Sequence, residues 1–275
     1  SEPYSVSTKN YINSKGNVVF NDEEIKLIDT LEDLLPIVRP DEYLIVKTML
    51  EDQKVDFDKI IEKYPNTSIE TLEYASDYLK RIKVINDKID ISKVNGELKE
   101  YLLDTVNYGL SRYEREFGDN KEKFKLYQNY TRDQVAISNL KRSEKSYSEL
   151  GTYYENDNKD TIIFVGLKKD VDSKLGYKDK FMNSSIFQWE SRNSLSGNEE
   201  RKLRQSETVY LFVRKMESED GIQLPYTYFG TGKFENIRDS YTEEKGRKFK
   251  TLLFDIKLDN KVPEEYYFDF NIKEN

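Results

Sequence analysis

The sequence predicts an α+β protein, with a helical N-terminal half followed by a part rich in β-strands. Up to about residue 140, apolar residues recur at the spacing of amphipathic helices. From Tyr147 onward they come in short runs rich in β-branched and aromatic residues, which polar loops separate. The 275 residues, 36% of them hydrophobic, suffice for packed cores. We expect an extended lead-in over residues 1–20, a helical domain over 21–145 and a β-rich domain over 146–275.

The helical domain is expected to open with a helix that starts near Asp22 and ends before Pro36. A proline inside a helix removes a hydrogen bond and clashes with the preceding turn, so the helix cannot continue through it. Apolar residues at helical spacing predict a later helix over residues 95–118 and a further helical stretch from 121 to about 140.

Between these helices lies a compact pattern over about residues 41–92. Three helices are predicted to begin at Asp41, Asp56 and Ser68, whose side chains suit N-cap positions. A small hairpin is predicted over residues 84–91. Three helices followed by a hairpin are the outline of a winged helix-turn-helix.

The third of these helices carries the wrong charges for reading DNA. A recognition helix exposes Arg, Lys, Asn or Gln. Here the early polar positions are Glu70, Glu73 and Asp77, and the cations Lys80 and Arg81 come only at the end. Such a face repels phosphate, so for this unit we favour a packing or protein-docking role over direct DNA contact.

The C-terminal part is predicted to hold at least five strands joined by long connections. Strand-rich segments of this kind, with little helix between them, indicate a barrel or a strongly bent sheet. The predicted strands cover residues 161–167, 186–190, 209–214, 226–231 and 249–258.

The composition excludes most enzyme mechanisms. The chain has no Cys and no His, which removes thiol nucleophiles, imidazole bases and Cys/His zinc sites. Carboxylate, Lys, Tyr or Ser chemistry stays open, but no spacing demands it. The segment Gly197-Asn198-Glu199-Glu200 lacks the GK[ST] of a phosphate-binding P-loop, and no nuclease-type carboxylate spacing occurs. We therefore expect no catalytic residue, no metal ligand and no cofactor in this chain.

Charge and hydropathy predict a protein that is neither a bulk nucleic-acid binder nor a membrane protein. The net charge of −8 counts against binding driven by overall positive charge. One segment, Lys168–Lys215, has 11 basic and 7 acidic residues. No apolar run approaches the roughly 18 residues needed to cross a bilayer, and the start, Ser1-Glu2-Pro3-Tyr4, lacks the features of a signal peptide. We expect a cytoplasmic protein without a membrane partner.

The same segment holds the chain's most unusual cluster of side chains. Tyr177-Lys178-Asp179-Lys180-Phe181 is followed closely by Phe187-Gln188-Trp189-Glu190-Ser191-Arg192, which includes the only Trp. A pocket for an unstacked base needs flat apolar faces, groups that hydrogen-bond the base edge, and cations for the adjacent phosphates. All three kinds of group occur here.

A simpler interpretation is that the strand has two ordinary faces. Alternate residues of a strand point to opposite sides, so Phe187 and Trp189 would belong to the core while Gln188 and Glu190 would be solvated. Composition alone favours this second interpretation.

An ordered set of segments over roughly residues 125–265 comprises Tyr130-Thr131-Arg132 with Gln134, the strand from Thr161 to Lys168, Tyr177-Lys178-Asp179, Phe187 to Ser191, Leu211-Phe212-Val213-Arg214, Pro225 to Gly230, and a final strand before Pro263. In order and spacing, this set resembles the domain of unknown function 3427, a family that typically forms the C-terminal part of bacterial DEAD/DEAH-box helicases with a phospholipase-D-like nuclease domain. The family usually has Phe-His-Trp-Gln-Ser-Gln where this chain has Phe187-Gln188-Trp189-Glu190-Ser191-Arg192.

The resemblance implies a DNA-processing protein of bacterial restriction or phage defence, whose helicase and nuclease domains would lie in other parts of the parent protein. The first hypothesis is therefore a non-catalytic DNA-recognition module, a PUA/SRA-like or B3-like β-pseudobarrel that reads a modified or flipped base in duplex or single-stranded DNA. The alternative is a regulatory scaffold that docks on the helicase core. A hydrolase is the least favoured of the three possibilities.

Under the first hypothesis, each candidate residue has a role. Phe187 or Trp189 would stack on a base, Gln188 or Glu190 would read its edge, and the cations would hold phosphates. The full set of candidate DNA-binding residues is Tyr177, Lys178, Lys180, Phe187, Gln188, Trp189, Glu190, Ser191, Arg192, Arg214 and Tyr228.

Overall fold

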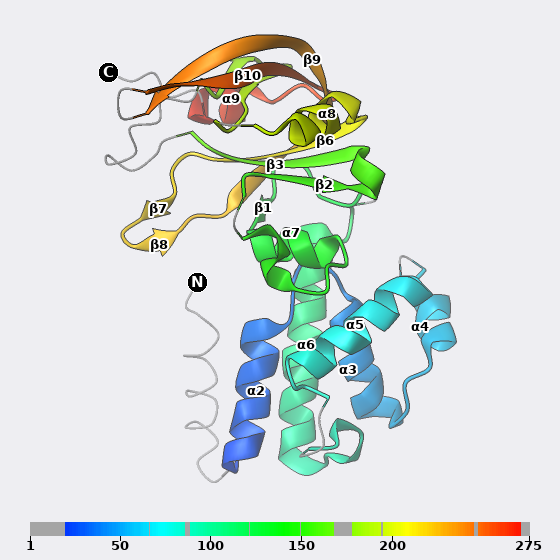
Figure 1. The fold of residues 1–275 in the computed structure, drawn as a ribbon. Helices are drawn as coiled ribbons and strands as arrows, with labels where there is room; N and C mark the ends of the chain where they lie inside the picture. The colour runs from blue at the N-terminus through cyan, green and yellow to red at the C-terminus, as the bar shows by residue number, and fades with distance from the viewer. Residues whose placement is uncertain are drawn as a thin grey trace. The chain divides into compact units, whose positions relative to one another are not determined.

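The computed structural model describes residues 20–65, 67–85, 89–120, 122–148, 150–167, 178–193, 195–244 and 247–270. The chain divides into two compact units (Figure 1). The described residues of 1–120 and 137–142 form what we call the helical unit, and those of 121–136 and 143–275 form the β unit. The mixture of helices with one large sheet confirms the predicted α+β class.

The β unit is built on a mixed sheet of eight strands. In the order β2-β3-β6-β9-β10-β5-β4, only β3 and β6 are parallel neighbours, and β1 pairs with β9. All five predicted strands are present. The strands are β1 (Asn129–Tyr130), β2 (Thr152–Glu155), β3 (Asp160–Gly166), β4 (Lys180–Asn183), β5 (Ile186–Glu190), β6 (Thr208–Arg214), β9 (Tyr226–Glu244) and β10 (Arg247–Leu258), with a separate hairpin of β7 (Ser218–Glu219) and β8 (Ile222–Gln223).

The long strand β9 connects the two halves of this sheet. Its first residues pair with β1 and β6, and from Gly232 onward it pairs with β10 (Figure 1). At the crossing, a Cβ atom on Gly232 would lie 2.5 Å from the carbonyl oxygen of Lys257, so only glycine fits there. The order ends at β2 on one side and β4 on the other. The described strands therefore form an open sheet and not the closed barrel that was one of the two expectations.

Among the described residues, three α-helices occur between or after the strands of the large sheet along the chain. They are α7 (Arg132–Ser138), α8 (Gly197–Gln205) and α9 (Glu264–Phe270). The helix predicted from 121 to about 140 is wrong over its first half, because Asn129–Tyr130 form strand β1 and only Arg132–Ser138 are helical. The tyrosines that gave this segment a helical pattern pack in the β unit, where Tyr130 contacts Phe124 and Phe212.

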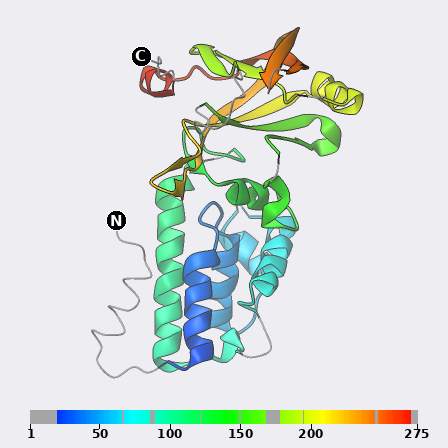
Figure 2. The ribbon, with the colours of Figure 1, turned by 60° about the vertical axis from the view of Figure 1, so that its left-hand side comes forward.

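The helices of the helical unit begin and end close to the predicted residues, although Pro40 and not Asp41 is the cap residue of α3. Asn21 caps the first helix through the backbone N–H groups of Glu23 and Glu24, and the helix ends before Pro36. Asp56 and Ser68 cap the next helices as expected. Figure 2 shows the long α6 beside α2 and α3. The helices are α2 (Asp22–Leu34), α3 (Asp41–Asp52), α4 (Phe57–Lys63), α5 (Ile69–Arg81) and α6 (Gly96–Phe117), with a 3₁₀ turn at Ile91–Lys93.

The predicted hairpin over residues 84–91 is not seen in the part of it that the structure describes. Residues 86–88 lie outside the described residues, while Ile85 and Ile89 pack on the helical core and Ile91 begins a 3₁₀ turn. The alternating apolar residues, which indicated strands, instead pack against the core formed by the helices. The winged-helix assignment is therefore not confirmed.

Helices α3 and α6 approach each other closely. A Cβ atom on Gly109 of α6 would lie 2.0 Å from the ring of Tyr43, so the glycine leaves room for this ring. The hydroxyl of Tyr43 donates to the carbonyl oxygen of Leu35, which ties the end of the first helix to α3. Among the described residues, no helix combines the length and hydropathy that crossing a bilayer requires.

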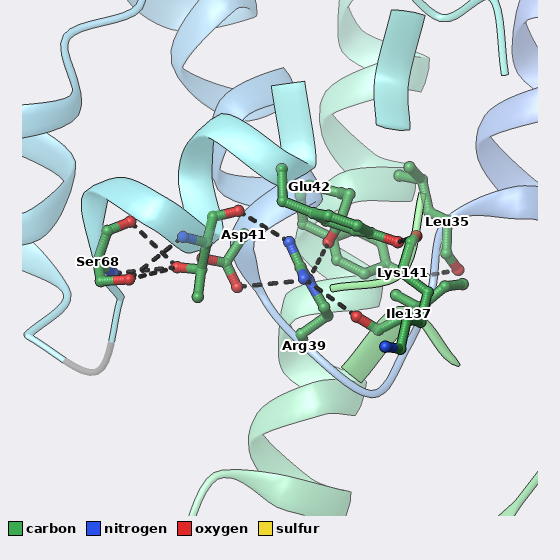
Figure 3. Close-up of polar contacts among 10 residues, drawn as sticks. Leu35, Arg39, Asp41, Glu42, Ser68, Ile137 and Lys141 are labelled. Atoms are coloured by element: carbon green, nitrogen blue, oxygen red, sulfur yellow. Dashed lines mark hydrogen bonds and ion pairs between the residues drawn. The ribbon is translucent and has the colours of Figure 1, made fainter. Parts of the chain in front are cut away.

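A buried charged cluster lies at the start of α3 (Figure 3). The Nε atom of Arg39 donates to Glu42 at 3.0 Å and lies 3.7 Å from Asp41. Its two Nη atoms donate to the carbonyl oxygens of Thr71, at 2.9 Å, and Ile137, at 3.5 Å. One guanidinium thereby joins α3, α5 and the segment at residue 137, all within the helical unit.

This cluster contains two carboxylates and one cation. Burial raises the pKa of Glu42 to about 7, because the nearby charge of Arg39 offsets only part of the cost of desolvation and Asp41 adds repulsion. One oxygen of Glu42 and one of Asp41 have no hydrogen-bond partner among the described residues. The helical unit therefore contains an acid that titrates near neutrality.

We predict that Glu42→Gln flattens the pH dependence of stability. Because the folded pKa of Glu42 is raised, its stabilising contribution is present below the unfolded pKa and is lost as pH rises toward about 7. The free energy of unfolding should fall over this range by up to about 1.4 kcal/mol per pH unit in the parent protein. Urea denaturation at several pH values, followed by circular dichroism, measures it.

The matched control is Glu51→Gln, which removes an exposed carboxylate from the same helix. It should leave the pH dependence of the parent protein unchanged. If the parent and Glu42→Gln proteins showed the same slope between about pH 5 and pH 7, the assignment of this titration to Glu42 would be wrong.

Candidate functional site

Strand β5 is buried on both of its faces. Phe187 is 0% and Trp189 6% exposed on one side, and Gln188 is 8% and Glu190 2% exposed on the other. Both interpretations of this strand from the sequence are therefore incomplete. The rings belong to a core, but the polar residues between them are not solvated.

The ring-bearing face of β5 packs into the apolar core of the β unit. Phe187 meets Phe181 edge to face, with ring centroids 4.8 Å apart. Trp189 lies 5.3 Å from Phe254 and is stacked at 5.8 Å on Phe234. As placed, Phe187 is enclosed by protein, so it contributes to packing and offers no open surface for stacking.

The opposite face of β5 carries a hydrogen-bonded network around the buried carboxylate of Glu190. One oxygen accepts from the hydroxyls of Thr251, at 2.6 Å, and Ser240, at 3.0 Å. The other accepts from the backbone N–H of Lys178 at 3.1 Å. The ammonium group of Lys178 donates to Ser240 at 2.9 Å, and the amide of Gln188 donates to the carbonyl oxygen of Lys178 at 2.7 Å. These contacts compensate the cost of burying the polar side chain of Glu190.

Exposed cations surround this polar face. Residues that lie opposite one another in a sheet share a face, and the register places Lys180 opposite Gln188, and Lys257 opposite Lys233. Lys180 and Lys233 are exposed and have no ion-pair partner among the described residues. Arg238, on the same face, is paired with Asp255 at 2.7 Å, and this hydrogen bond raises the pKa of Arg238 and lowers the pKa of Asp255.

A cavity of about 240 Å³ opens at the end of β5. Its aromatic lining residues are Trp189, Tyr154 and Phe164, so the largely buried Trp189 borders an accessible space. Segments from β2, β3, β5 and α8 contribute to it. The remaining lining residues are Leu150, Gly151, Thr152, Val165, Gly166, Asp179, Glu190, Arg192, Leu195, Glu199 and Leu203.

An ion pair lies at the solvent side of the cavity. The side chain of Arg192 is 51% exposed, and its guanidinium donates to one oxygen of Glu199 at 2.6 and 3.1 Å. Ser196 caps α8 and donates to the other oxygen. Burial acts to raise the pKa of Glu199, but the hydrogen bonds from Ser196 and Arg192 outweigh it, so this pKa lies below its ordinary value. Glu199 is therefore ionised at neutral pH.

Tyr154 stays protonated beside this pair. Burial raises the pKa of Tyr154 to about 12, and the negative charge of Glu199 contributes in the same direction. The ammonium group of Lys202 lies 5.0 Å from the centre of its ring, which holds α8 against β2. The cavity thus offers flat aromatic surfaces, hydrogen-bonding groups and a cation at its edge.

The structure brings together only part of the candidate set from the sequence. Trp189, Glu190 and Arg192 line the cavity, while Lys178, Lys180 and Gln188 belong to the adjoining polar face. Tyr177 lies outside the described residues. Ser191 is fully buried, and its hydroxyl accepts from the backbone N–H of Leu252, so it joins β5 to β10.

Arg214 and Tyr228 make their contacts in another part of the β unit. The guanidinium of Arg214 is buried 4.5 Å from the centre of the Tyr226 ring and donates to the carbonyl oxygens of Glu217 and Leu224, which closes the loop carrying β7 and β8. Tyr228 is buried against Phe124 and Phe212. These placements give Arg214 and Tyr228 roles in packing, not at the cavity.

The candidate set from the sequence lacked several residues that line the cavity. Thr152 and Tyr154 belong to a four-residue strand without an apolar run, which no strand pattern indicated. Glu199 could have been found, because Ser196 and Glu199 have the spacing of a capping box and thus predict the start of α8. Among the described residues, no group of three or more carboxylates is placed to hold a metal ion.

A known protein family matches the part of the sequence that contains the cavity. The family described as "Domain of unknown function (DUF3427)" matches residues 124–270. The chain belongs to this family. DUF3427 membership confirms the resemblance seen in the sequence, and the match includes every residue that lines the cavity. No curated protein matches the chain.

Two solved structures show weak similarity to the chain. The DNA modification-dependent restriction endonuclease AspBHI is 10% identical, with a TM-score of 0.31, over 46% of this chain and 39% of that protein. The Type IV phosphorothioation-dependent restriction endonuclease ScoMcrA is 10% identical, with a TM-score of 0.34, over 96% of this chain and 60% of that protein. The chain therefore spans less than two thirds of either protein, and TM-scores this low do not establish a shared fold.

We predict that Glu190→Ala destabilises the β unit by at least about 2 kcal/mol, because it leaves the buried donors of Thr251, Ser240 and Lys178 without their acceptor. Glu190→Gln should cost less, since an amide oxygen still accepts. The control, Glu235→Ala, removes an exposed carboxylate 3.7 Å from Lys257 and should change stability by less than about 0.5 kcal/mol. Equal losses for the two alanine variants in chemical denaturation would contradict the structural role of the network.

Proposed function

We propose that the β unit is a non-catalytic DNA-recognition module that receives a flipped base in the cavity beside Trp189. The observation that carries this proposal is the cavity itself, which is lined by the aromatic residues Trp189 and Tyr154, by the hydrogen-bonding residues Thr152 and Glu199, and by the cation Arg192 at its edge. Enzymes and readers that extrude a base stack it between aromatic side chains and hydrogen-bond its edge. The cavity combines these elements on one sheet.

The size of the cavity supports a single base as its occupant. Pockets for drug-sized ligands measure about 300–1,000 Å³, and this one measures about 240 Å³. A whole nucleotide with its phosphate is a poor fit to such a space. We therefore propose that the backbone of the DNA stays outside, next to the polar face with its exposed Lys180 and Lys233.

The distribution of charge also favours the β unit over the helical unit as the part that meets DNA. The sequence ranges 121–136 and 143–275, which hold the β unit, contain 26 basic and 27 acidic residues, whereas the ranges 1–120 and 137–142, which hold the helical unit, contain 18 and 25. Phosphate contacts supply much of the affinity of DNA-binding proteins. The nearly neutral β unit can present a local basic surface, and the acidic helical unit opposes such contact.

The setting we propose is a restriction or phage-defence protein whose helicase and nuclease activities lie in other domains. The relation to PUA/SRA-like or B3-like base readers is part of the same proposal. It is supported by the way residues of β2, β3 and β5, which are not all neighbours in the sheet, line one cavity.

A second candidate function concerns the helical unit. Glu70, Glu73 and Asp77 are exposed on α5, and Ile69 is exposed at its start. This acidic surface with an apolar residue favours docking on a protein, such as the helicase core of the parent chain, over contact with DNA. The two functions are compatible, because different units would perform them.

We predict that DNA binding changes the fluorescence of Trp189, which is the only Trp in the chain. Thr152 lines the cavity and lies opposite Ile163 in the sheet register, so its side chain is on the same face as this core residue. The larger side chain of Thr152→Phe should therefore fill the cavity and abolish the fluorescence change. Titration with plain and modified duplexes and with single strands, followed by fluorescence and anisotropy together, measures both binding and cavity occupancy.

Arg192→Gln should weaken binding several-fold, because it removes the cation at the edge of the cavity. Arg201→Gln is the matched control, since it removes an exposed cation of α8 that does not line the cavity. Silence in anisotropy on every DNA tested, at low and moderate salt, would refute the proposal. If the two arginine variants weakened binding equally, the cavity would not be the part of the β unit that binds DNA.

A further inference from the structure

We infer that Leu150 enters the base stack of duplex DNA and fills the space that an extruded base leaves behind. This inference rests on the proposed function and adds the kind of DNA that the β unit recognises, which is a double strand. It starts from the rim of the cavity, by which we mean the lining residues that are exposed to solvent.

The rim presents one apolar side chain and one cation. Leu150 is 46% exposed, and the side chain of Arg192 is 51% exposed. The other described lining residues are half-buried or buried, apart from Gly151, which has no side chain. A single exposed leucine is ordinary on a protein surface. This one, however, lies at the entrance that a base must pass to reach Trp189.

The backbone of Leu150 is fixed at both of its hydrogen-bonding groups. Its N–H donates to the hydroxyl of Tyr153 at 2.7 Å, and its carbonyl oxygen accepts from Nη1 of Arg132 at 2.6 Å. The same nitrogen donates to the carbonyl oxygen of Tyr147 at 3.0 Å. The guanidinium lies 4.9 Å from the centre of the Phe164 ring, which belongs to the cavity lining. Leu150 is therefore held in place before DNA arrives, which lowers the entropic cost of using its side chain in binding.

Base extrusion from a duplex calls for an apolar side chain at this place. Flipping a base breaks its stacking and its pairing, and the hole that it leaves exposes the flat faces of the neighbouring bases to water. Proteins that unstack DNA insert leucine, isoleucine, phenylalanine or methionine between bases. A leucine in the hole buries these apolar faces again. A single strand has no paired stack to keep closed, so this contribution is specific to the duplex.

The test measures the binding of Leu150→Ala to a mixed-sequence duplex of about 20 base pairs and to one of its strands alone, with Trp189 fluorescence and anisotropy recorded on the full chain. We expect duplex binding to weaken about tenfold, because the buried leucine side chain is lost, and single-strand binding to change by less than about twofold. Leu150→Met should keep duplex binding within about threefold of the parent protein, since methionine can fill the same space. Thermal unfolding verifies that the variants fold.

The matched control is Leu126→Ala, which makes the same change at a leucine of the β unit that is 42% exposed and is not among the described residues that line the cavity. It should leave both affinities unchanged. If Leu150→Ala bound the duplex as tightly as the parent protein, or weakened duplex and single-strand binding equally, the inference would be overturned and the proposed function would stand. The same conclusion would follow if the parent protein bound only the single strand. If the parent protein bound neither DNA, the proposed function would fail as well.

Discussion

The burial of Glu190 is the constraint on which the candidate site depends. A carboxylate that is 2% exposed is tolerated only when its oxygens are hydrogen-bonded, and its donors come from β9, β10 and the chain just before β4. Satisfying this one group therefore fixes three separate segments against β5. Trp189, the preceding residue, is held by the same strand with its indole toward the apolar core and the cavity.

This arrangement makes one strand serve two surfaces of the β unit. The ring-bearing face anchors β5 in the core, and the polar face carries the network with exposed lysines beside it. The cavity opens where the two meet, because Asp179 accepts from the backbone of Glu190 while Trp189 lines the same space. A local basic surface can therefore adjoin an acidic cavity in a protein of net charge −8. Under the proposed function, the phosphates would meet the basic surface and the base would meet the cavity.

Local signals in the sequence predicted the elements, and long-range contacts decided the site. Proline and N-cap residues were enough to place the ends of α2, α4 and α5. The hairpin predicted over residues 84–91 is not seen in the described part of that segment, because alternating apolar residues also suit a segment packed on helices. The partners of Glu190 could not be predicted, since Ser240 and Thr251 lie 50 and 61 residues away in the chain and look like ordinary strand residues. Tyr154 was missed for the same reason, because its four-residue strand could be assigned only from its pairing with β3 in the sheet.

The most direct test of base binding beside Trp189 is to replace the single Trp with 5-fluorotryptophan and to follow its ¹⁹F NMR resonance during a DNA titration. If a base enters the cavity beside Trp189, this resonance should shift saturably at the concentration where DNA binds. The same titration of Thr152→Phe should show binding without the shift. A resonance that stays unchanged in the parent protein while DNA is bound would contradict the account, because the base would then lie elsewhere.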